Sequence, residues 1–125
     1  MAENNPINYA VIPHNCELWK QEHPSLNLED VKEYSNSFPV YADDVIRKLK
    51  KCVECGQLYF YEMLEYIDWD EGNDPSYRTY IPVVSATEAD KLAFVSQLEI
   101  VEQIPQIRKD WPKEVSQPVI SWVRK

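Results

Sequence analysis

Two stretches rich in aromatic and branched side chains, residues 57–68 and 77–84, constrain the fold of this chain more than any other feature. Such residues favour extended backbone, and the segment between them, residues 70–76, is dense in turn formers. From Leu58 to Tyr61 apolar side chains occupy odd and even positions alike, so both faces of this stretch are apolar. A strand that is covered on both faces belongs in the middle of a sheet. The sequence therefore predicts a central antiparallel hairpin.

Four helices are expected around this hairpin. Residues 25–34 are predicted to form a short helix, with Asn27 as its N-cap and acidic residues in the first turn. Residues 41–51 begin with acidic residues and end with basic ones, which matches the helix dipole and gives favourable i,i+4 charge pairs. A capping box opens the longest predicted helix, residues 85–101, and a proline begins a further short one, residues 105–110.

The remaining segments complete the predicted fold. Residues 119–123 are expected to form a final strand, whereas prolines interrupt residues 1–24 and make that N-terminal segment irregular. A chain of 125 residues corresponds to one domain with a sizeable core. We therefore predict a single α+β domain, residues 1–125, with several helices packed on a small, mostly antiparallel sheet.

Targeting signals and cysteine content bear on the cellular compartment. No apolar run approaches 18 residues, so no membrane span is expected. The first residues lack the basic start and apolar block of a signal peptide, which favours a cytoplasmic protein. In that reducing compartment the three cysteines are expected to be free thiols rather than a disulfide framework.

The balance of charge restricts the partners. The chain has 13 Lys and Arg against 21 Asp and Glu, a net charge of −8 with a pI near 4.7. Direct binding to nucleic acid is not expected, because affinity for phosphates requires clustered Lys and Arg. A cationic protein partner is favoured instead, since an acidic surface would accelerate encounter. The alternative is that the charge only maintains solubility.

The Cys52-x-x-Cys55-Gly56 motif is open to three interpretations. A thioredoxin-like redox site places its reactive thiol at the start of a helix, whereas this motif is expected to follow one. In a zinc knuckle, two thiolates on a tight turn supply half of a tetrahedral site. The remaining ligands would then come from Cys16 with His14 or His23. In the third interpretation no metal is bound, Cys52 ends an apolar helix stripe, Cys55 packs in the core and Gly56 caps the helix.

The sequence does not predict an enzyme. Cys16 lies near two histidines, but no third group is evident to orient a catalytic base. Glu62 and Glu65 are three residues apart on a predicted strand, so they point to opposite faces and cannot flank one glycosidic bond. No Gly-rich phosphate loop and no metalloprotease helix motif occurs.

The end of the predicted hairpin concentrates negative charge next to aromatic residues. Six carboxylates and no Lys or Arg occur between Glu62 and Asp74. Aromatic side chains are effective anchors at protein interfaces, and neighbouring carboxylates would pair with Lys or Arg of a partner. The predicted partner-binding residues are Glu62, Glu65, Asp68, Trp69, Asp70, Glu71, Asp74 and Tyr77. The alternative is an aromatic core strand followed by a solvated turn.

The run Cys52-x-x-Cys55-Gly56-x-Leu58-Tyr59-x-Tyr61-Glu62, together with Gly72-Asn73-Asp74 and Asp110-Trp111-Pro112, resembles small bacterial immunity proteins. These belong to contact-dependent growth inhibition and related polymorphic toxin systems. The resemblance implies tight one-to-one binding of a cognate protein toxin domain, basic and nuclease-like, and carries over no catalytic residue. A different class of function also fits the sequence, namely a zinc-knuckle module with a structural or regulatory role.

Overall fold

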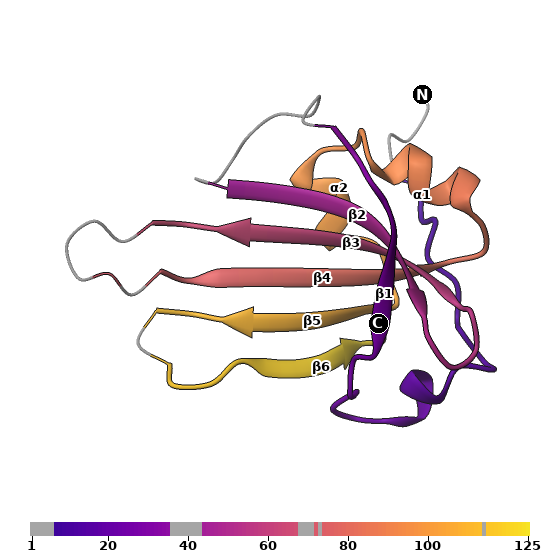
Figure 1. Ribbon diagram of the computed structural model, residues 1–125, viewed down its shortest axis with the longest axis horizontal. Helices are drawn as coiled ribbons and strands as arrows, with labels where there is room; N and C mark the ends of the chain where they lie inside the picture. The colour runs from indigo at the N-terminus through magenta and orange to yellow at the C-terminus, as the bar shows by residue number, and fades with distance from the viewer. Residues whose placement is uncertain (1–6, 36–43, 68–71, 73, 114) are drawn as a thin grey trace.

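The computed structural model describes residues 7–35, 44–67, 72, 74–113 and 115–125. Within these residues, six strands form one antiparallel sheet in which each strand pairs with its neighbours in the sequence (Figure 1). The strands are β1 (Leu28–Glu33), β2 (Asp44–Cys52), β3 (Leu58–Glu65), β4 (Ser76–Val83), β5 (Gln106–Trp111) and β6 (Val119–Val123). Two short helices, α1 (Ala86–Leu92) and α2 (Gln97–Val101), connect β4 to β5, and a 3-10 helix, η1 (Glu17–Lys20), lies in the N-terminal segment. None of these helices has the length and apolar character needed to cross a membrane.

The predicted central hairpin is confirmed. β3 and β4 pair without interruption from Leu58 opposite Val83 to Glu65 opposite Ser76. β3 is buried along nearly its whole length, with Tyr59 and Phe60 completely inaccessible to solvent. Both faces of this strand are therefore covered, as its apolar residues on odd and even positions indicate.

The prediction of an α+β fold with several packed helices is wrong, because the described residues are almost entirely β. Among the described residues, strands stand in place of three of the four expected helices: β1 lies within residues 25–34, β2 begins at Asp44 within the region expected as helix 41–51, and β5 replaces the helix expected at residues 105–110. In β2 the side chains from Val45 to Lys50 alternate between buried and partly exposed, which is the period of a strand. Burial of one face of this strand outweighs the helix-like order of its charges. Those charges pair across strands instead: Asp30 of β1 accepts from Lys48 and Lys50 of β2 at 2.9 and 2.7 Å.

The region predicted as one long helix, residues 85–101, contains two short ones. The Ser85 side chain accepts from the Thr87 backbone N–H at 3.3 Å, and its hydroxyl donates to the Glu88 carboxylate, so Ser85 is the N-cap of α1. Ser96 repeats the arrangement for α2, where its hydroxyl accepts from the Glu99 backbone N–H at 3.3 Å. A second helix therefore begins after Ser96, and the helix predicted over residues 85–101 is divided in two.

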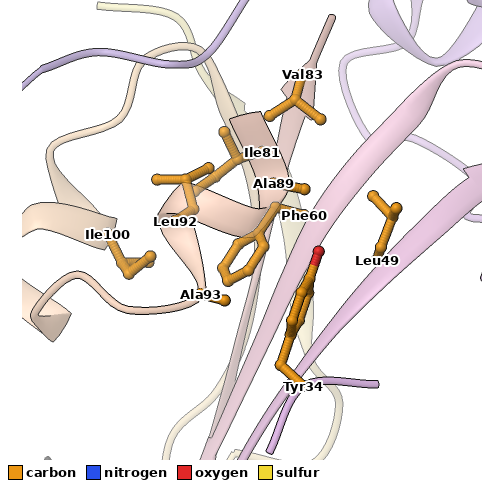
Figure 2. Packing of buried hydrophobic residues seen from close by; sticks show 9 residues of the cluster. All are labelled: Tyr34, Leu49, Phe60, Ile81, Val83, Ala89, Leu92, Ala93 and Ile100. Carbon is orange, nitrogen blue, oxygen red and sulfur yellow. The ribbon is translucent and has the colours of Figure 1, made fainter. Parts of the chain in front are cut away.

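The two helices cover one face of the sheet. Phe60 and Ile81 point from β3 and β4 towards α1, and Tyr34 and Leu49 extend the same apolar layer (Figure 2). The complete buried cluster is Tyr34, Leu49, Phe60, Ile81, Val83, Ala89, Leu92, Ala93 and Ile100.

A buried ion pair joins this helical cover to the sheet. Arg47 of β2 lies opposite Glu62 of β3, with Nη2 at 2.7 Å and Nε at 2.9 Å from the Glu62 carboxylate. The Arg47 Nη1 group also donates to the carbonyls of Ala93 and Val95, at 3.0 and 2.9 Å. Burial raises the pKa of Glu62, against the attraction of Arg47 and Arg108 that lowers it. Arg47 thus satisfies carbonyl groups at the end of α1 that have no partner within the helix.

The opposite face is covered by the N-terminal segment. Leu18 and Leu26 pack with Tyr59, Ile107 and other apolar residues that point away from the helices. The Trp122 indole N–H of β6 donates to the Leu18 carbonyl at 2.7 Å, which fixes η1 over the sheet. Among residues 7–27, η1 is the single helical element and no strand is present. Tyr9 and Ala10 pack against the cluster on the helical face instead. We call residues 13–27 the N-terminal cover.

Candidate functional site

Three cysteines meet where the N-terminal cover reaches the β2–β3 hairpin. The sulfur atoms of Cys16, Cys52 and Cys55 all lie within 4.8 Å of one another. Cys52 is the last residue of β2, Cys55 belongs to the turn that follows, and Cys16 immediately precedes η1. All three are free thiols, with Cys16 and Cys52 buried and Cys55 exposed. The cluster therefore links two segments that are distant in the sequence.

The β2–β3 turn brings Cys55 back towards Cys52. The Cys52 N–H donates to the Gln57 carbonyl at 2.8 Å, and the Gly56 N–H donates to the Cys52 carbonyl at 2.9 Å. Gly56 has φ +83°, a left-handed conformation that glycine adopts without steric cost. The interpretation in which Cys55 packs in the core and Gly56 caps a helix is therefore wrong, because Cys55 is exposed and the turn joins two strands.

Local hydrogen bonds favour an anionic sulfur at Cys52. Burial acts to raise the pKa of the Cys52 thiol, but the backbone N–H groups of Cys55 and Glu54 and the neighbouring thiols of Cys55 and Cys16 together lower it below its usual value. For Cys16 burial prevails and raises the pKa to about 11, although the Tyr59 hydroxyl and the Leu18 backbone N–H donate to its sulfur. The surroundings of the two buried thiols thus shift their pKa values in opposite directions, down for Cys52 and up for Cys16.

Tyr59 supports the cluster from the sheet. Its hydroxyl donates to the Cys16 sulfur at 3.2 Å, and burial raises the pKa of Tyr59 so that the hydroxyl keeps its proton. Sequence reasoning missed this residue as part of the site. Strand alternation relates Tyr59 to the cysteines. Tyr59 pairs with Lys50, and Cys52 lies two residues after Lys50, so Tyr59 and Cys52 are on the same face of the sheet.

The two histidines named with the cysteines occupy different places. His14 lies two residues before Cys16 and lines a cavity of about 520 Å³ together with Cys16 and Cys55. His23 Nδ1 lies 2.7 Å from the Ile120 carbonyl of β6, on the far strand of the sheet. In the described part of the chain, neither a histidine nor a carboxylate joins the three sulfur atoms within 4.8 Å.

The predicted acidic partner surface is only partly described by the structure. Asp68, Trp69, Asp70 and Glu71 lie outside the described residues. Asp74 is exposed, and with the half-buried Glu65 it lines a shallow pocket of about 330 Å³ that also includes Arg78 and Trp111. Tyr77 is half-buried and pairs with Leu64, so it lies on the opposite face from Glu65.

Glu62 does not belong to that surface. It was predicted as a partner-binding residue, but its side chain is 1% exposed and bound by Arg47 in the interior. The alternation along β3 turns Glu62 towards the helical cover, on the same face as Phe60. A partner could reach it only if the helices were displaced, so its role is in the fold.

Comparisons with protein-family models, with curated proteins and with solved structures found no match for this chain. The chemistry of the cysteine cluster is therefore the main guide to function. Thiolates are soft ligands that bind zinc and copper(I) strongly, and structural zinc sites contain two to four of them. Amide and hydroxyl groups that donate to the sulfur atoms are typical of the surroundings of metal-bound ligands. The donor set thus fits a zinc ion.

Proposed function

We propose that this chain is a non-catalytic binding module whose N-terminal cover is fastened to the sheet by zinc held by Cys16, Cys52 and Cys55. The observation that carries this proposal is the convergence of three sulfur atoms within 4.8 Å from two separate segments. Two buried thiols and one exposed thiol gathered at one point of a sheet have no packing advantage over ordinary apolar side chains. As thiolates around one cation, they form a cross-link.

The position of the cluster indicates a structural rather than a catalytic zinc. Cys16 lies between the apolar core under the N-terminal cover and the turn after β2. Backbone hydrogen bonds within the cover are short-range, such as those from the Cys16 N–H to Pro13 and from the Trp19 N–H to Cys16. Zinc at Cys16 would therefore add a link between the cover and the β2–β3 hairpin. Structural zinc contributes directly to folding free energy, because the assembled site does not exist in the unfolded chain.

The test is metal analysis combined with local stability. The chain, purified under reducing conditions without added metal, should contain about one zinc per molecule, as expected for one site. Chelation should lower the melting temperature and increase amide hydrogen exchange in residues 13–20 and 52–57, while α1 stays protected. Cys16→Ser and Cys52→Ser should each lose the zinc.

A matched control separates zinc loss from general destabilisation. Ile100 of α2 is buried on the face of the sheet covered by the helices, and it does not line the cavities that contain the cysteines. Ile100→Val should lower the melting temperature through lost packing but retain one zinc. Zinc well below one per chain, together with no effect of chelation on exchange in residues 13–20, would overturn the proposal.

A second function is favoured by the distribution of charge. The chain carries a net charge of −8, and Glu65 and Asp74 line one pocket beside Trp111, which is 39% exposed. We propose on this basis an immunity-type inhibitor that neutralises a cognate, basic, nuclease-like toxin domain through the end of the β3–β4 hairpin. An acidic surface with an exposed indole suits a partner rich in Lys and Arg.

This second function is tested with acidic residues of the hairpin. A partner captured from the native cell and identified as a basic toxin domain would be titrated with the variant Asp68→Asn, Asp70→Asn, Glu71→Gln and Asp74→Asn. Affinity should fall at least about tenfold, and its dependence on salt should flatten. The control removes four exposed acids elsewhere, at Glu22, Glu29, Glu33 and Glu102. Equal loss in both variants would mean that net charge alone, and not the hairpin, drives binding.

A further inference from the structure

The cysteine cluster provides three ligands, whereas a structural zinc site is almost always four-coordinate. The chain has two histidines, and imidazole is the usual fourth ligand beside three thiolates. The structure separates these two candidates.

His14 lies at the open side of the cluster. The Cys16 N–H donates to the Pro13 carbonyl at 2.9 Å, so His14 belongs to the tight turn that delivers Cys16 to the hairpin. The His14 side chain is exposed and lines the same cavity, of about 520 Å³, as Cys16 and the exposed Cys55. In the structure His14 is outside the group of atoms within 4.8 Å, so its exposed side chain would have to turn towards the sulfur atoms across this cavity.

His23 is held elsewhere. Its Nδ1 atom lies 2.7 Å from the Ile120 carbonyl, and Ile120 belongs to β6, four strands away from the β2 strand that carries Cys52. A ring fixed to that carbonyl is not available to the cluster.

The neighbouring carboxylates lie on another side. Glu17 and Glu54 line a different cavity, of about 290 Å³, together with Cys52 and Leu18. The backbone N–H of Glu54 already donates to the Cys52 sulfur. Glu54 therefore contributes to the site through its backbone N–H, which donates to the Cys52 sulfur.

We infer that His14 is the fourth ligand, so that zinc is held by His14, Cys16, Cys52 and Cys55. This inference rests on the proposed zinc-binding function. One ligand pair, His14-x-Cys16, comes from the N-terminal cover, and the other, Cys52-x-x-Cys55, comes from the hairpin. Each segment then supplies two ligands, and the ion joins them symmetrically. Binding requires the neutral imidazole and three thiolates, so protons are released as zinc enters.

The experiment compares His14→Ala with the matched variant His23→Ala in the full chain, with X-ray absorption of the bound zinc and competition against a chromophoric chelator. The wild-type zinc should have three sulfur neighbours and one nitrogen. In His14→Ala the nitrogen should be replaced by oxygen, and zinc affinity should fall at least about tenfold with the loss of one of four ligands. His23→Ala should match the wild type in both measurements. His14→Cys should give four sulfur neighbours and recover tight binding.

The other possible results would contradict either the assignment of His14 or the proposed zinc site as a whole. A wild-type zinc with three sulfurs and one oxygen, or His14→Ala with unchanged neighbours and affinity, would overturn the assignment of His14 and leave the three-cysteine site standing. Wild-type protein without zinc would overturn the proposed function itself. A long-range nitrogen–proton NMR spectrum of the wild-type protein, which shows whether the His14 ring is metal-bound, gives the same answer without a substitution.

Discussion

The two faces of the sheet are covered in different ways. On one face, α1 and α2 satisfy much of their own backbone hydrogen bonding, begin with serine N-caps and receive Arg47 at the end of α1. On the other face, the N-terminal cover contains η1 as its regular element among residues 13–27 and depends on groups supplied by the sheet. An irregular cover thus relies on anchors from outside for more of its hydrogen bonding than a helical cover does.

The anchors of the N-terminal cover are side chains of β6 and its flank, and the cysteine cluster. Trp122 donates to the Leu18 carbonyl, and Arg124 donates to the Trp19 carbonyl at 2.8 Å. The Trp19 and Trp122 rings meet edge to face with centroids 4.9 Å apart. These contacts hold the cover at η1, and Cys16 lies next to η1 where the cover passes the β2–β3 turn.

The largest expected effect concerns the helical face. Arg47→Met should lower the free energy of unfolding by about 3–5 kcal/mol, because it leaves Glu62 as a buried charge without its ion-pair partner. It also removes the donor to the carbonyls of Ala93 and Val95. Urea denaturation of the two proteins measures the difference.

The double variant Arg47→Met with Glu62→Met sharpens this prediction. Replacing both charges by apolar side chains should recover part of the lost stability, since neither charge is then stranded in the interior. Zinc content should remain that of the wild type in both variants, because the pair lies on the face opposite the cysteines. Loss of zinc in these folded variants would show that the two faces are not independent.

A smaller effect is expected on the face of the N-terminal cover. Tyr59→Phe removes the hydroxyl that donates to the Cys16 sulfur at 3.2 Å. Zinc affinity should fall roughly 10- to 100-fold, the range typical for loss of a group that hydrogen-bonds a metal ligand. Competition with a chelator measures this change.

Tyr34→Phe is the matched control for that variant. Tyr34 is also buried, and its hydroxyl donates to Asp90 at 3.0 Å on the helical face. This change should lower stability slightly and leave zinc affinity unchanged. Equal affinity losses in the two tyrosine variants would point to general loosening of the core.

The smallest expected effect lies at the edge strand β1, outside both covers. Hydrogen bonds from Lys50 and Lys48 lower the pKa of Asp30 to about 2, from its ordinary value of 3.8. A lowered folded-state pKa contributes stability above that ordinary value, and the contribution is lost as pH falls from about 4 to about 2. Because Asp30 is half-exposed, the contribution is at most about 1 kcal/mol.

Asp30→Asn tests this prediction. The variant should be slightly less stable than the wild type at neutral pH, and the difference should disappear near pH 2. Glu29→Gln is the control, since Glu29 pairs with Lys51 at a longer distance of 3.3 Å. A constant difference between Asp30→Asn and the wild type from pH 7 to pH 2 would contradict the role given to the Asp30 charge.

The parts of the fold predicted correctly are those determined by local sequence. The β3–β4 hairpin follows from aromatic strands and a turn between them, and the start of α1 follows from Ser85 and Glu88. β2 was mispredicted because its acidic start and basic end suit a helix dipole equally well. Its real partners, Asp30 and Glu62, are on neighbouring strands, which no local pattern reveals.

The candidate site shows the same limit. The Cys52-x-x-Cys55 turn can be recognised from spacing and Gly56, and Cys16 could be named only as one of several completing ligands. The position of Cys16 next to this turn depends on how the irregular N-terminal segment crosses the sheet. Contacts such as that of Trp122 with Leu18 determine this path. The density of carboxylates between Glu62 and Asp74 predicts that Glu62 lies on the surface. The alternation of side chains along β3 instead directs Glu62 into the interior.

The hydrogen bonds from Trp122 and Arg124 to Leu18 and Trp19 have a consequence for biosynthesis. Residues near 18 leave the ribosome long before β6 exists, so the N-terminal cover has no complete docking surface until the last strand is made. The meander from β1 to β6 can pair strand by strand during translation, since each strand needs only its predecessor. Cys52 and Cys55 can come together as soon as the β2–β3 hairpin forms, and Tyr59 of the same hairpin offers its hydroxyl to Cys16. We therefore expect η1 to dock on Trp122 and Arg124 later than Cys16 reaches the hairpin.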